Sequence, residues 1–145
     1  MGALAHIAVT DFKGAVMISR RVFVLSASAL FAAGALPAYA AQEVTAQQAY
    51  QLIQDNPDII VLDIRTGREF RSGHISGAIN INYFDQNFRD RIAQLDGSKI
   101  YIMHCAAGGR SDASIRILRN AGLTNVYHMG GGTSEWKSQG LPLVR

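Results

Sequence analysis

Short apolar runs and helical patterns alternate along residues 42–145. The runs 59–64 and 99–104 are rich in branched residues and are typical of buried strands. Weaker patterns predict two more strands, over 78–81 and 125–128. Apolar residues at helical spacing predict helices or helical turns over 46–54, 66–70, 84–95, 111–121 and 133–138. Strands that alternate with helices favour an α/β fold, with a mostly parallel central sheet and helices on both faces.

The first 40 residues differ in composition from the rest. Segment 17–40 begins with Arg20 and Arg21, continues with an apolar stretch over 22–36 and ends on Ala38-Tyr39-Ala40. This layout is typical of a secretory signal peptide. The stretch is short and diluted by alanine, serine and glycine, which favours a cleaved signal over a membrane anchor. We therefore expect cleavage near Ala40, export to the periplasm and no stable membrane insertion afterwards.

The export route and the start of translation stay open. The stretch SRRVF at 19–23 fits a twin-arginine motif, and paired arginines also occur in ordinary Sec signals. Residues 1–16 fit no part of a signal, so translation starts at either Met1 or Met17. In both cases we predict an N-terminal extension with its signal over 1–40, and a single domain over 41–145.

Removing the signal changes what the charge implies. The whole chain has 14 Lys and Arg against 11 Asp and Glu, but residues 41–145 hold 11 basic and 10 acidic residues. Binding of nucleic acid needs a clustered basic face, and a balanced composition gives no indication of one. We expect a small-molecule substrate and no nucleic-acid partner, and we expect the domain to be a monomer.

The chain has one cysteine, Cys105, in the stretch HCAAGGRS at 104–111. A lone cysteine cannot close an internal disulfide, and a lone thiol in an exported protein is open to oxidation. Cys105 directly follows the predicted strand 99–104, and ligands of open α/β sheets bind beyond the carboxyl ends of strands. This position favours a reactive thiol over an inert buried one.

The residues after Cys105 are suited to binding an anion. Gly108 and Gly109 allow backbone amides to turn toward one centre, and the N-terminus of the next helix adds partial positive charge. Arg110 offers a guanidinium to a bound oxyanion, and Ser111 is expected to cap the helix. The same electric field lowers the pKa of a thiol, so Cys105 is predicted to be a thiolate nucleophile.

Three motifs in this order resemble those of the rhodanese family of sulfurtransferases. DIRTGREFRSGHISGAINI at 63–81 is similar to the family segment Asp-x-Arg-x-x-x-Glu-Phe…Gly-His-Ile-x-Gly-Ala-x-Asn-Ile. The loop fits Cys-x-x-Gly-x-Arg-Ser, and GGTSEWKSQGLP at 131–142 resembles a closing Gly-Gly…Trp…Gly-x-Pro. The resemblance covers about 44–143 and implies a rhodanese-like fold. The exported layout is most similar to the small periplasmic thiosulfate sulfurtransferases of the phage-shock type.

The resemblance implies a two-step transfer with Cys105 as the catalytic residue. Its thiolate takes the sulfane sulfur of thiosulfate or another persulfide donor, and the Cys105 persulfide passes that sulfur to a thiol, to cyanide or to a protein acceptor. The implied substrate-binding residues are Ala106, Ala107, Gly108, Gly109, Arg110 and Ser111. This chemistry requires no metal and no organic cofactor.

Two departures from the family pattern bear on the donor. Two-domain thiosulfate enzymes of the family carry basic side chains just after the cysteine, where this chain has Ala106 and Ala107. They also carry an arginine where this chain has Glu69. Arg110 and the loop amides would then bind the donor anion alone. We therefore expect low activity with thiosulfate, or another persulfide as the natural donor.

Three side chains near the same sheet edge are expected to support the loop. Asp63 and Arg65 could touch substrate, but they are expected to pair with each other or with loop backbone. His104 precedes the nucleophile, and neighbours on a strand face opposite sides, so it is expected to orient the loop. His74 is interpreted as a hydrogen-bonding residue within a turn. The histidines show no metal-ligand spacing, so no metal site is predicted.

Two alternative functions stay open. Cysteine-dependent phosphatases and arsenate reductases carry a similar His-Cys…Arg-Ser string, but with five residues between Cys and Arg, where this chain has the four residues 106–109. A shorter ring has less room for a tetrahedral phosphate. The other alternative is a non-catalytic binding or redox-sensing module, in which Cys105 is modified without turnover.

Overall fold

The computed structural model describes residues 41–145. The predicted extension and signal over 1–40 lie outside the described residues, so cleavage near Ala40 and export stay predictions. Within 41–145, no helix has the length and apolar character needed to cross a membrane.

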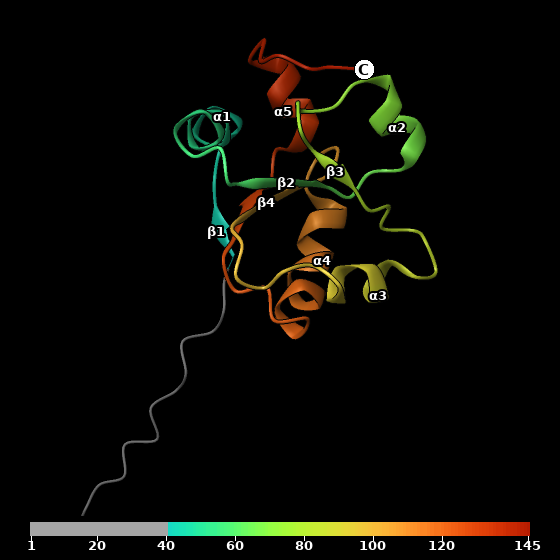
Figure 1. The fold of residues 1–145 in the computed structure, drawn as a ribbon. Coiled ribbons are helices and arrows are strands. Elements are labelled where there is room, and N and C mark those ends of the chain that lie inside the picture. The colour runs from blue at the N-terminus through green and yellow to red at the C-terminus, as the bar shows by residue number, and fades with distance from the viewer. Residues whose placement is uncertain (1–40) are drawn as a thin grey trace, which may run out of the picture. The chain divides into compact units, whose positions relative to one another are not determined.

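The centre of the domain is a five-stranded sheet in the order β1-β5-β4-β2-β3, and all its strand pairs are parallel. The strands are β1 (Gln42–Glu43), β2 (Ile60–Asp63), β3 (Ile79–Asn80), β4 (Tyr101–His104) and β5 (Val126–Met129). Their arrangement is visible in Figure 1. Parallel pairing aligns the carboxyl ends of the strands, and β4 lies in the middle of the order. The residue after β4 is therefore placed at the centre of the carboxyl edge.

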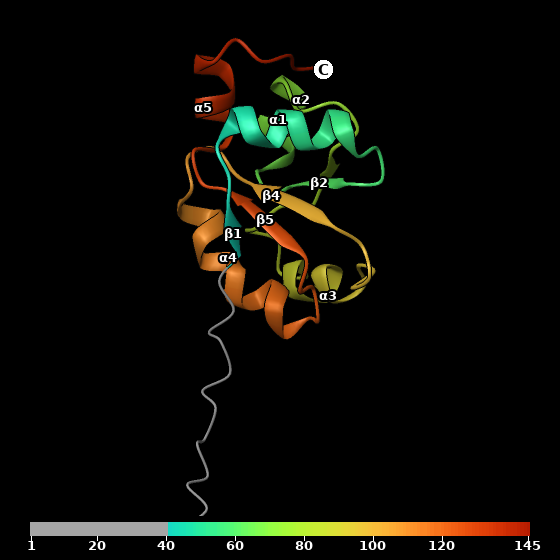
Figure 2. The same cartoon turned by 90° about the vertical axis from the view of Figure 1, so that its left-hand side faces the viewer.

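Helices cover both faces of this sheet, which confirms the predicted α/β architecture (Figures 1 and 2). One face carries α1 (Ala46–Asp55), α2 (Gly67–Ser72) and α5 (Gly132–Ser138). The other carries α3 (Phe88–Ala93) and α4 (Gly109–Asn120). A separate apolar cluster fills each interface, one around Ile102 and Trp136 and the other around Met103 and Leu118. Residues 102 and 103 are neighbours on β4 and point to opposite faces, as the pleat requires.

The starts of α1 and α2 follow from their sequences. Thr45 accepts a hydrogen bond from the amide of Gln48, whose side chain accepts one from the Thr45 amide, and this reciprocal pair caps the helix. Thr66 and Glu69 form the same pair at the start of α2. The second pair fixes the carboxylate of Glu69 close to the carboxyl edge of the sheet, where it also meets the site described below.

Two predicted helix starts are wrong. The helix expected over 84–95 spans only Phe88–Ala93, because Asn82 closes a turn by accepting from the Phe84 amide and donating to Asp85. Ser111 does not cap α4. The helix begins at Gly109 after an N-cap at Gly108 without a side-chain hydrogen bond, so Ser111 lies inside the first turn and is fully buried.

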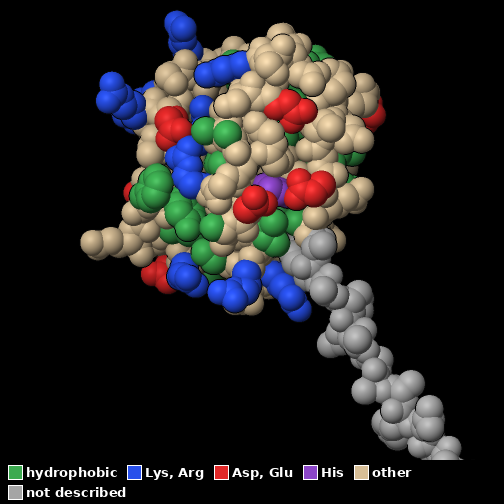
Figure 3. Space-filling model, turned by 180° about the vertical axis from the view of Figure 1, so that it is seen from behind, with side chains coloured by type: hydrophobic (Ala, Val, Ile, Leu, Met, Phe, Trp, Pro, Cys, Tyr) green, Lys and Arg blue, Asp and Glu red, His purple; other side chains and the backbone are tan. Residues whose placement is uncertain are grey.

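Surface charge is mixed on the face shown in Figure 3, where Lys and Arg side chains are interspersed with acidic and neutral ones. This agrees with the near-balanced composition of residues 41–145.

Candidate active site

Cys105 follows β4 directly and lies at the bottom of the loop that leads into α4. Its side chain is only 1% exposed. The amide of Gly108 donates to Sγ at 3.2 Å, and the hydroxyl of Ser111 lies 3.4 Å from the same atom. The sulfur thus lies inside a ring of donors at the N-terminus of a 12-residue helix, which favours negative charge there.

The ring depends on a backbone conformation that favours glycine. Gly108 has φ +95°, and a Cβ at this position would lie 2.6 Å from the carbonyl oxygen of Gly130. The loop is also held from behind by α5, since the amide of Thr133 donates to the carbonyl of Cys105 and that of Ser134 to the carbonyl of Ala106, at 3.0 and 2.9 Å. These two bonds point the first loop carbonyls away from the ring.

The environment lowers the pKa of the Cys105 thiol below its ordinary value. Burial acts against this, because desolvation disfavours the thiolate. Hydrogen bonds from the side chain of Ser111 and from the amides of Ser111, Ala107 and Arg110 outweigh burial. The predicted thiolate therefore has a specific set of donors, of which Ser111 is the strongest.

The guanidinium of Arg110 is paired with a carboxylate beside the ring. Its two terminal nitrogens donate to the two oxygens of Glu69 at 2.9 and 2.7 Å. The bonds from Arg110 lower the pKa of Glu69 to about 2, against an opposing contribution from burial and with help from Thr66. The guanidinium expected to bind the donor anion therefore has an internal counter-ion.

The opening of the Cys105 loop toward solvent, called the mouth below, is surrounded by small or apolar residues. Ala107 and Gly109 are exposed and Ala106 is half-buried. The ring of Phe84, 66% exposed, lies under the guanidinium of Arg110 with 5.7 Å between the guanidinium carbon and the ring centroid. The cationic side chain of Arg110 is thus flanked by both an acid and an aromatic ring.

Asp63 and Arg65 lie below the loop and are buried, at 0% and 2% exposure. They form a close ion pair, and Arg65 also donates to the carbonyl of Gly73 at 2.9 Å. This places the start of α2, and with it Glu69, at a fixed position beside the loop. His74 hydrogen-bonds the carbonyl of Phe70 within the same segment.

His104 is fully buried and contacts the loop through its backbone. Its Nδ1 lies 3.1 Å from the carbonyl oxygen of Cys105. Burial lowers the pKa of His104, although the nearby Asp63 and the Cys105 carbonyl act in the opposite direction. The imidazole is thus held neutral with Nδ1 donating, and it orients the peptide that follows β4.

A match to a known protein family identifies the type of domain to which this loop belongs. A profile described as "Rhodanese-like domain" matches residues 45–139. The chain belongs to the rhodanese-like domain family. The match contains every element from α1 to α5 and the whole Cys105 loop.

Solved structures of other rhodanese-like domains have the same fold. A rhodanese-related protein from Thermoplasma volcanium superposes with a TM-score of 0.63 at 32% identity, over 71% of this chain and 97% of that one. A thiosulfate sulfurtransferase from Pseudomonas aeruginosa superposes with a TM-score of 0.60 at 25% identity, over 72% of this chain and 20% of that one.

Curated relatives with this domain carry a different name. A tRNA uridine(34) hydroxylase from Yersinia pestis is 33% identical over 117 residues, which are 74% of this chain and 32% of that protein. The corresponding protein from Yersinia enterocolitica is 32% identical over the same length. This chain therefore spans about a third of the length of these relatives.

Sequence reasoning missed one group of residues that the rhodanese-like fold brings to the loop. His128 on β5 is 1% exposed; its Nε2 lies 2.8 Å from the Ser111 hydroxyl and its Nδ1 lies 2.5 Å from a carboxylate oxygen of Glu43 on β1. Asp112 lies 3.5 Å from the same Nδ1. The ligand atoms of Glu43, Asp112 and His128 all lie within 4.8 Å of one another, and the imidazole is already hydrogen-bonded on both sides. The sequence does not predict this group, because Glu43 and His128 are 85 positions apart.

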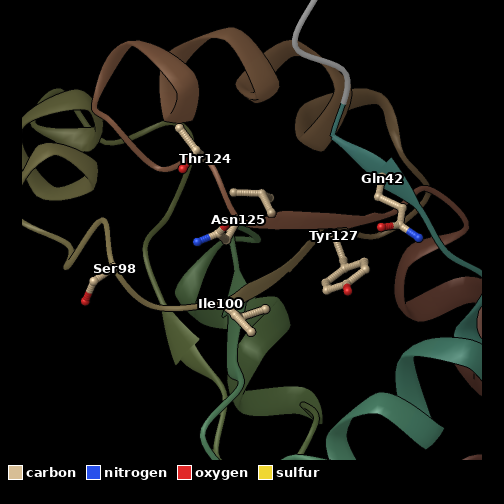
Figure 4. A pocket seen from close by; sticks show the side chains of 7 residues that line it. Gln42, Ser98, Ile100, Thr124, Asn125 and Tyr127 are labelled. Atoms are coloured by element: carbon tan, nitrogen blue, oxygen red, sulfur yellow. The ribbon is translucent and has the colours of Figure 1, made fainter.

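One hollow on the surface of residues 41–145 lies away from the cysteine. It measures about 470 Å³ and is lined by Gln42, Ser98, Ile100, Thr124, Asn125, Val126 and Tyr127. Figure 4 shows these side chains around the segments that lead into β4 and β5. That is the amino edge of the sheet, opposite Cys105, and its lining has hydroxyl and amide groups but no charged side chain, thiol or imidazole. We therefore assign the chemistry to the loop.

Proposed function

We propose that this domain is a sulfurtransferase that carries sulfane sulfur as a persulfide on Cys105. The observation that supports this most strongly is the ring of donors around Sγ, in which the Gly108 amide and the Ser111 hydroxyl reach the sulfur. Such a ring stabilises the attacking thiolate, and it can equally hold the terminal sulfur of a persulfide. Membership of the rhodanese-like family supports the same chemistry.

The proposed transfer has two displacement steps. The Cys105 thiolate attacks the outer sulfur of thiosulfate; a bond forms between the two sulfurs, and the sulfur–sulfur bond of thiosulfate breaks. Sulfite leaves with the electron pair of the broken bond. An acceptor thiolate or cyanide then attacks the outer sulfur of the persulfide, and the Cys105 thiolate leaves.

The loop length supports sulfur over phosphate. Only four residues, 106–109, separate Cys105 from Arg110. The bonds from Thr133 and Ser134 hold this short loop in place from behind, so it has little freedom to widen around a tetrahedral anion. We therefore rank the sulfurtransferase above a phosphatase or arsenate reductase.

The relatives leave the donor and the acceptor undefined. This chain shares an aligned stretch of 117 residues, 74% of its length, with a tRNA uridine(34) hydroxylase. That supports a shared loop chemistry without selecting a substrate. The small apolar mouth, with Arg110 paired to Glu69, favours a persulfide or a thiol-bound sulfur over a free dianion. We propose a periplasmic location on the basis of the signal-like segment 17–40.

Steady-state kinetics test this proposal. With thiosulfate as donor and cyanide as acceptor, we expect thiocyanate to form with parallel double-reciprocal lines, since sulfur is carried covalently between two separate steps. A glutathione persulfide donor is expected to give the higher kcat/KM. If neither donor supports sulfur transfer, the proposed function is wrong. Hydrolysis of an aryl phosphate in its place would support the phosphatase.

Glu69→Gln should improve the use of thiosulfate. The variant removes the counter-ion of Arg110, and a glutamine at this position can still accept from the Thr66 amide, so α2 keeps its cap. Because the pair is partly exposed, its release is worth about 1 kcal/mol, and we expect the KM for thiosulfate to fall about fivefold. Asp58→Asn, the same loss of charge at the start of β2, is the control. An unchanged or higher KM would show that Arg110 plays no part in binding the anion.

A further inference from the structure

We propose that Glu43, His128 and Ser111 form a relay that takes the proton from the thiol of Cys105. The three side chains and Sγ are joined end to end by contacts of 2.5, 2.8 and 3.4 Å. This inference deepens the proposed function, on which it rests for the use of the thiolate. In it, His128 is a positioning residue, since it acts on the sulfur through Ser111.

The outer contact sets the state of the imidazole. A carboxylate can only accept hydrogen bonds, so the Nδ1 of His128 carries a proton toward Glu43. In the neutral imidazole Nε2 is then an acceptor, and it receives the hydroxyl proton of Ser111. In the proposed starting state the oxygen of Ser111 accepts from the thiol of Cys105, 3.4 Å away, which is the reverse of the bond that Ser111 donates to the thiolate.

Loss of the thiol proton reverses the direction of two hydrogen bonds, the one between Cys105 and Ser111 and the one between Ser111 and His128. The thiol proton moves to the Ser111 oxygen while the hydroxyl proton moves to Nε2 of His128, so no atom is gained or lost. The products are a Cys105 thiolate that accepts from Ser111, and an imidazolium that donates to Ser111 and to Glu43. The hydroxyl of Ser111 also donates to the carbonyl of Gly108 at 2.8 Å, a bond that is open to it only in the thiolate state, when its proton no longer points to Nε2.

Burial and charge favour this route. His128 and Ser111 are 1% and 0% exposed, so water does not compete for the inner contacts. The charged groups that face His128 are Glu43 on β1 and Asp112 on α4, at 2.5 and 3.5 Å, and both are acidic. The side chains of these two carboxylates are exposed, at 64% and 68%. The step therefore leaves the added positive charge on the imidazole of His128, which lies between these two carboxylates.

The test is the pH dependence of Cys105 alkylation by iodoacetamide in wild type, His128→Gln and Glu43→Gln. Glutamine can still hydrogen-bond Ser111 but takes no proton, so His128→Gln should raise the midpoint by about one pH unit. Glu43→Gln should raise it by about half a unit. A simple through-space effect has the opposite sign, because the loss of a negative charge lowers a thiol pKa. Asp90→Asn, an exposed acid on α3, is the control and should leave the midpoint unchanged.

A second set of variants, made in the Ser111→Ala protein, tests whether the proton passes through the hydroxyl of Ser111. Ser111→Ala breaks the chain, so adding Glu43→Gln to Ser111→Ala should no longer raise the midpoint. A midpoint that is unchanged or lower in folded Glu43→Gln, or an equal rise in the Ser111→Ala background, would overturn the relay. If His128→Gln fails to fold, the exposed Glu43 variant decides alone.

Alkylation needs no sulfur donor, so this test is independent of the proposed function. If wild type transfers no sulfur, the proposed function fails while the midpoints still decide the relay. If the midpoints do not shift while sulfur transfer is normal, the relay fails and the proposed function stands.

Discussion

Replacing Cys105 with serine is expected to reduce sulfur transfer by at least about a thousandfold. The chain has no other cysteine to take its place. A serine hydroxyl stays protonated at neutral pH, and the loop amides that favour a thiolate cannot make it a comparable nucleophile toward sulfur. The rate of thiocyanate formation measures this loss.

We expect this loss of activity to come from the missing thiolate and not from unfolding of the variant. Sγ lies in a polar ring, where an oxygen can accept the same hydrogen bonds, so Cys105→Ser should retain the melting temperature of wild type within a few degrees. Residual transfer above a tenth of the wild-type rate in a folded variant would show that the sulfur is carried elsewhere or attacked directly.

Gly108→Ala is expected to reduce the stability of the fold strongly. The residue has φ +95°, and an added Cβ would lie 2.6 Å from the backbone oxygen of Gly130. The strained conformation and the clash together should cost about 2–4 kcal/mol. This corresponds to a fall of roughly 10–20 °C in the melting temperature. Because the amide of Gly108 also donates to Sγ, sulfur transfer should fall with it.

The neighbouring glycine is the matched control for stability. A Cβ at Gly109 meets nothing within 4 Å, and its φ is not among the positive ones. Gly109→Ala should leave the melting temperature unchanged or raise it slightly, since it restricts the unfolded chain at the first residue of α4. Equal melting temperatures for the two variants would show that the loop relaxes freely, against the tightly held ring described here.

Local patterns predicted those parts of the fold that depend on nearby residues. The runs 59–64 and 99–104 became β2 and β4 because four consecutive residues in each are buried or nearly so between two helical layers. The helix predicted over 46–54 begins at Ala46, as its apolar spacing indicated. The two-residue strand β1 was not predicted, since its exposed Gln42 and Glu43 carry no apolar pattern and pair only with β5.

The sequence predicts the Cys105 loop, but it does not predict the network of side-chain contacts around that loop. The glycines and the helix start after Cys105 indicate a donor ring from sequence alone. The partners of its side chains come from distant segments: Glu69 reaches Arg110 across 41 positions, and Glu43 reaches His128 across 85. Ser111 was expected as a helix cap, but the positive φ of Gly108 lets the helix start earlier and turns the serine inward to Cys105 and His128.

The most direct measurement is the intact mass of the protein after treatment with thiosulfate or glutathione persulfide, with Cys105→Ser treated in parallel. The account predicts a gain of one sulfur atom on wild type, its absence on the variant and its removal by cyanide with release of thiocyanate. A wild-type mass that stays unchanged with both donors would contradict the central claim that Cys105 carries sulfane sulfur.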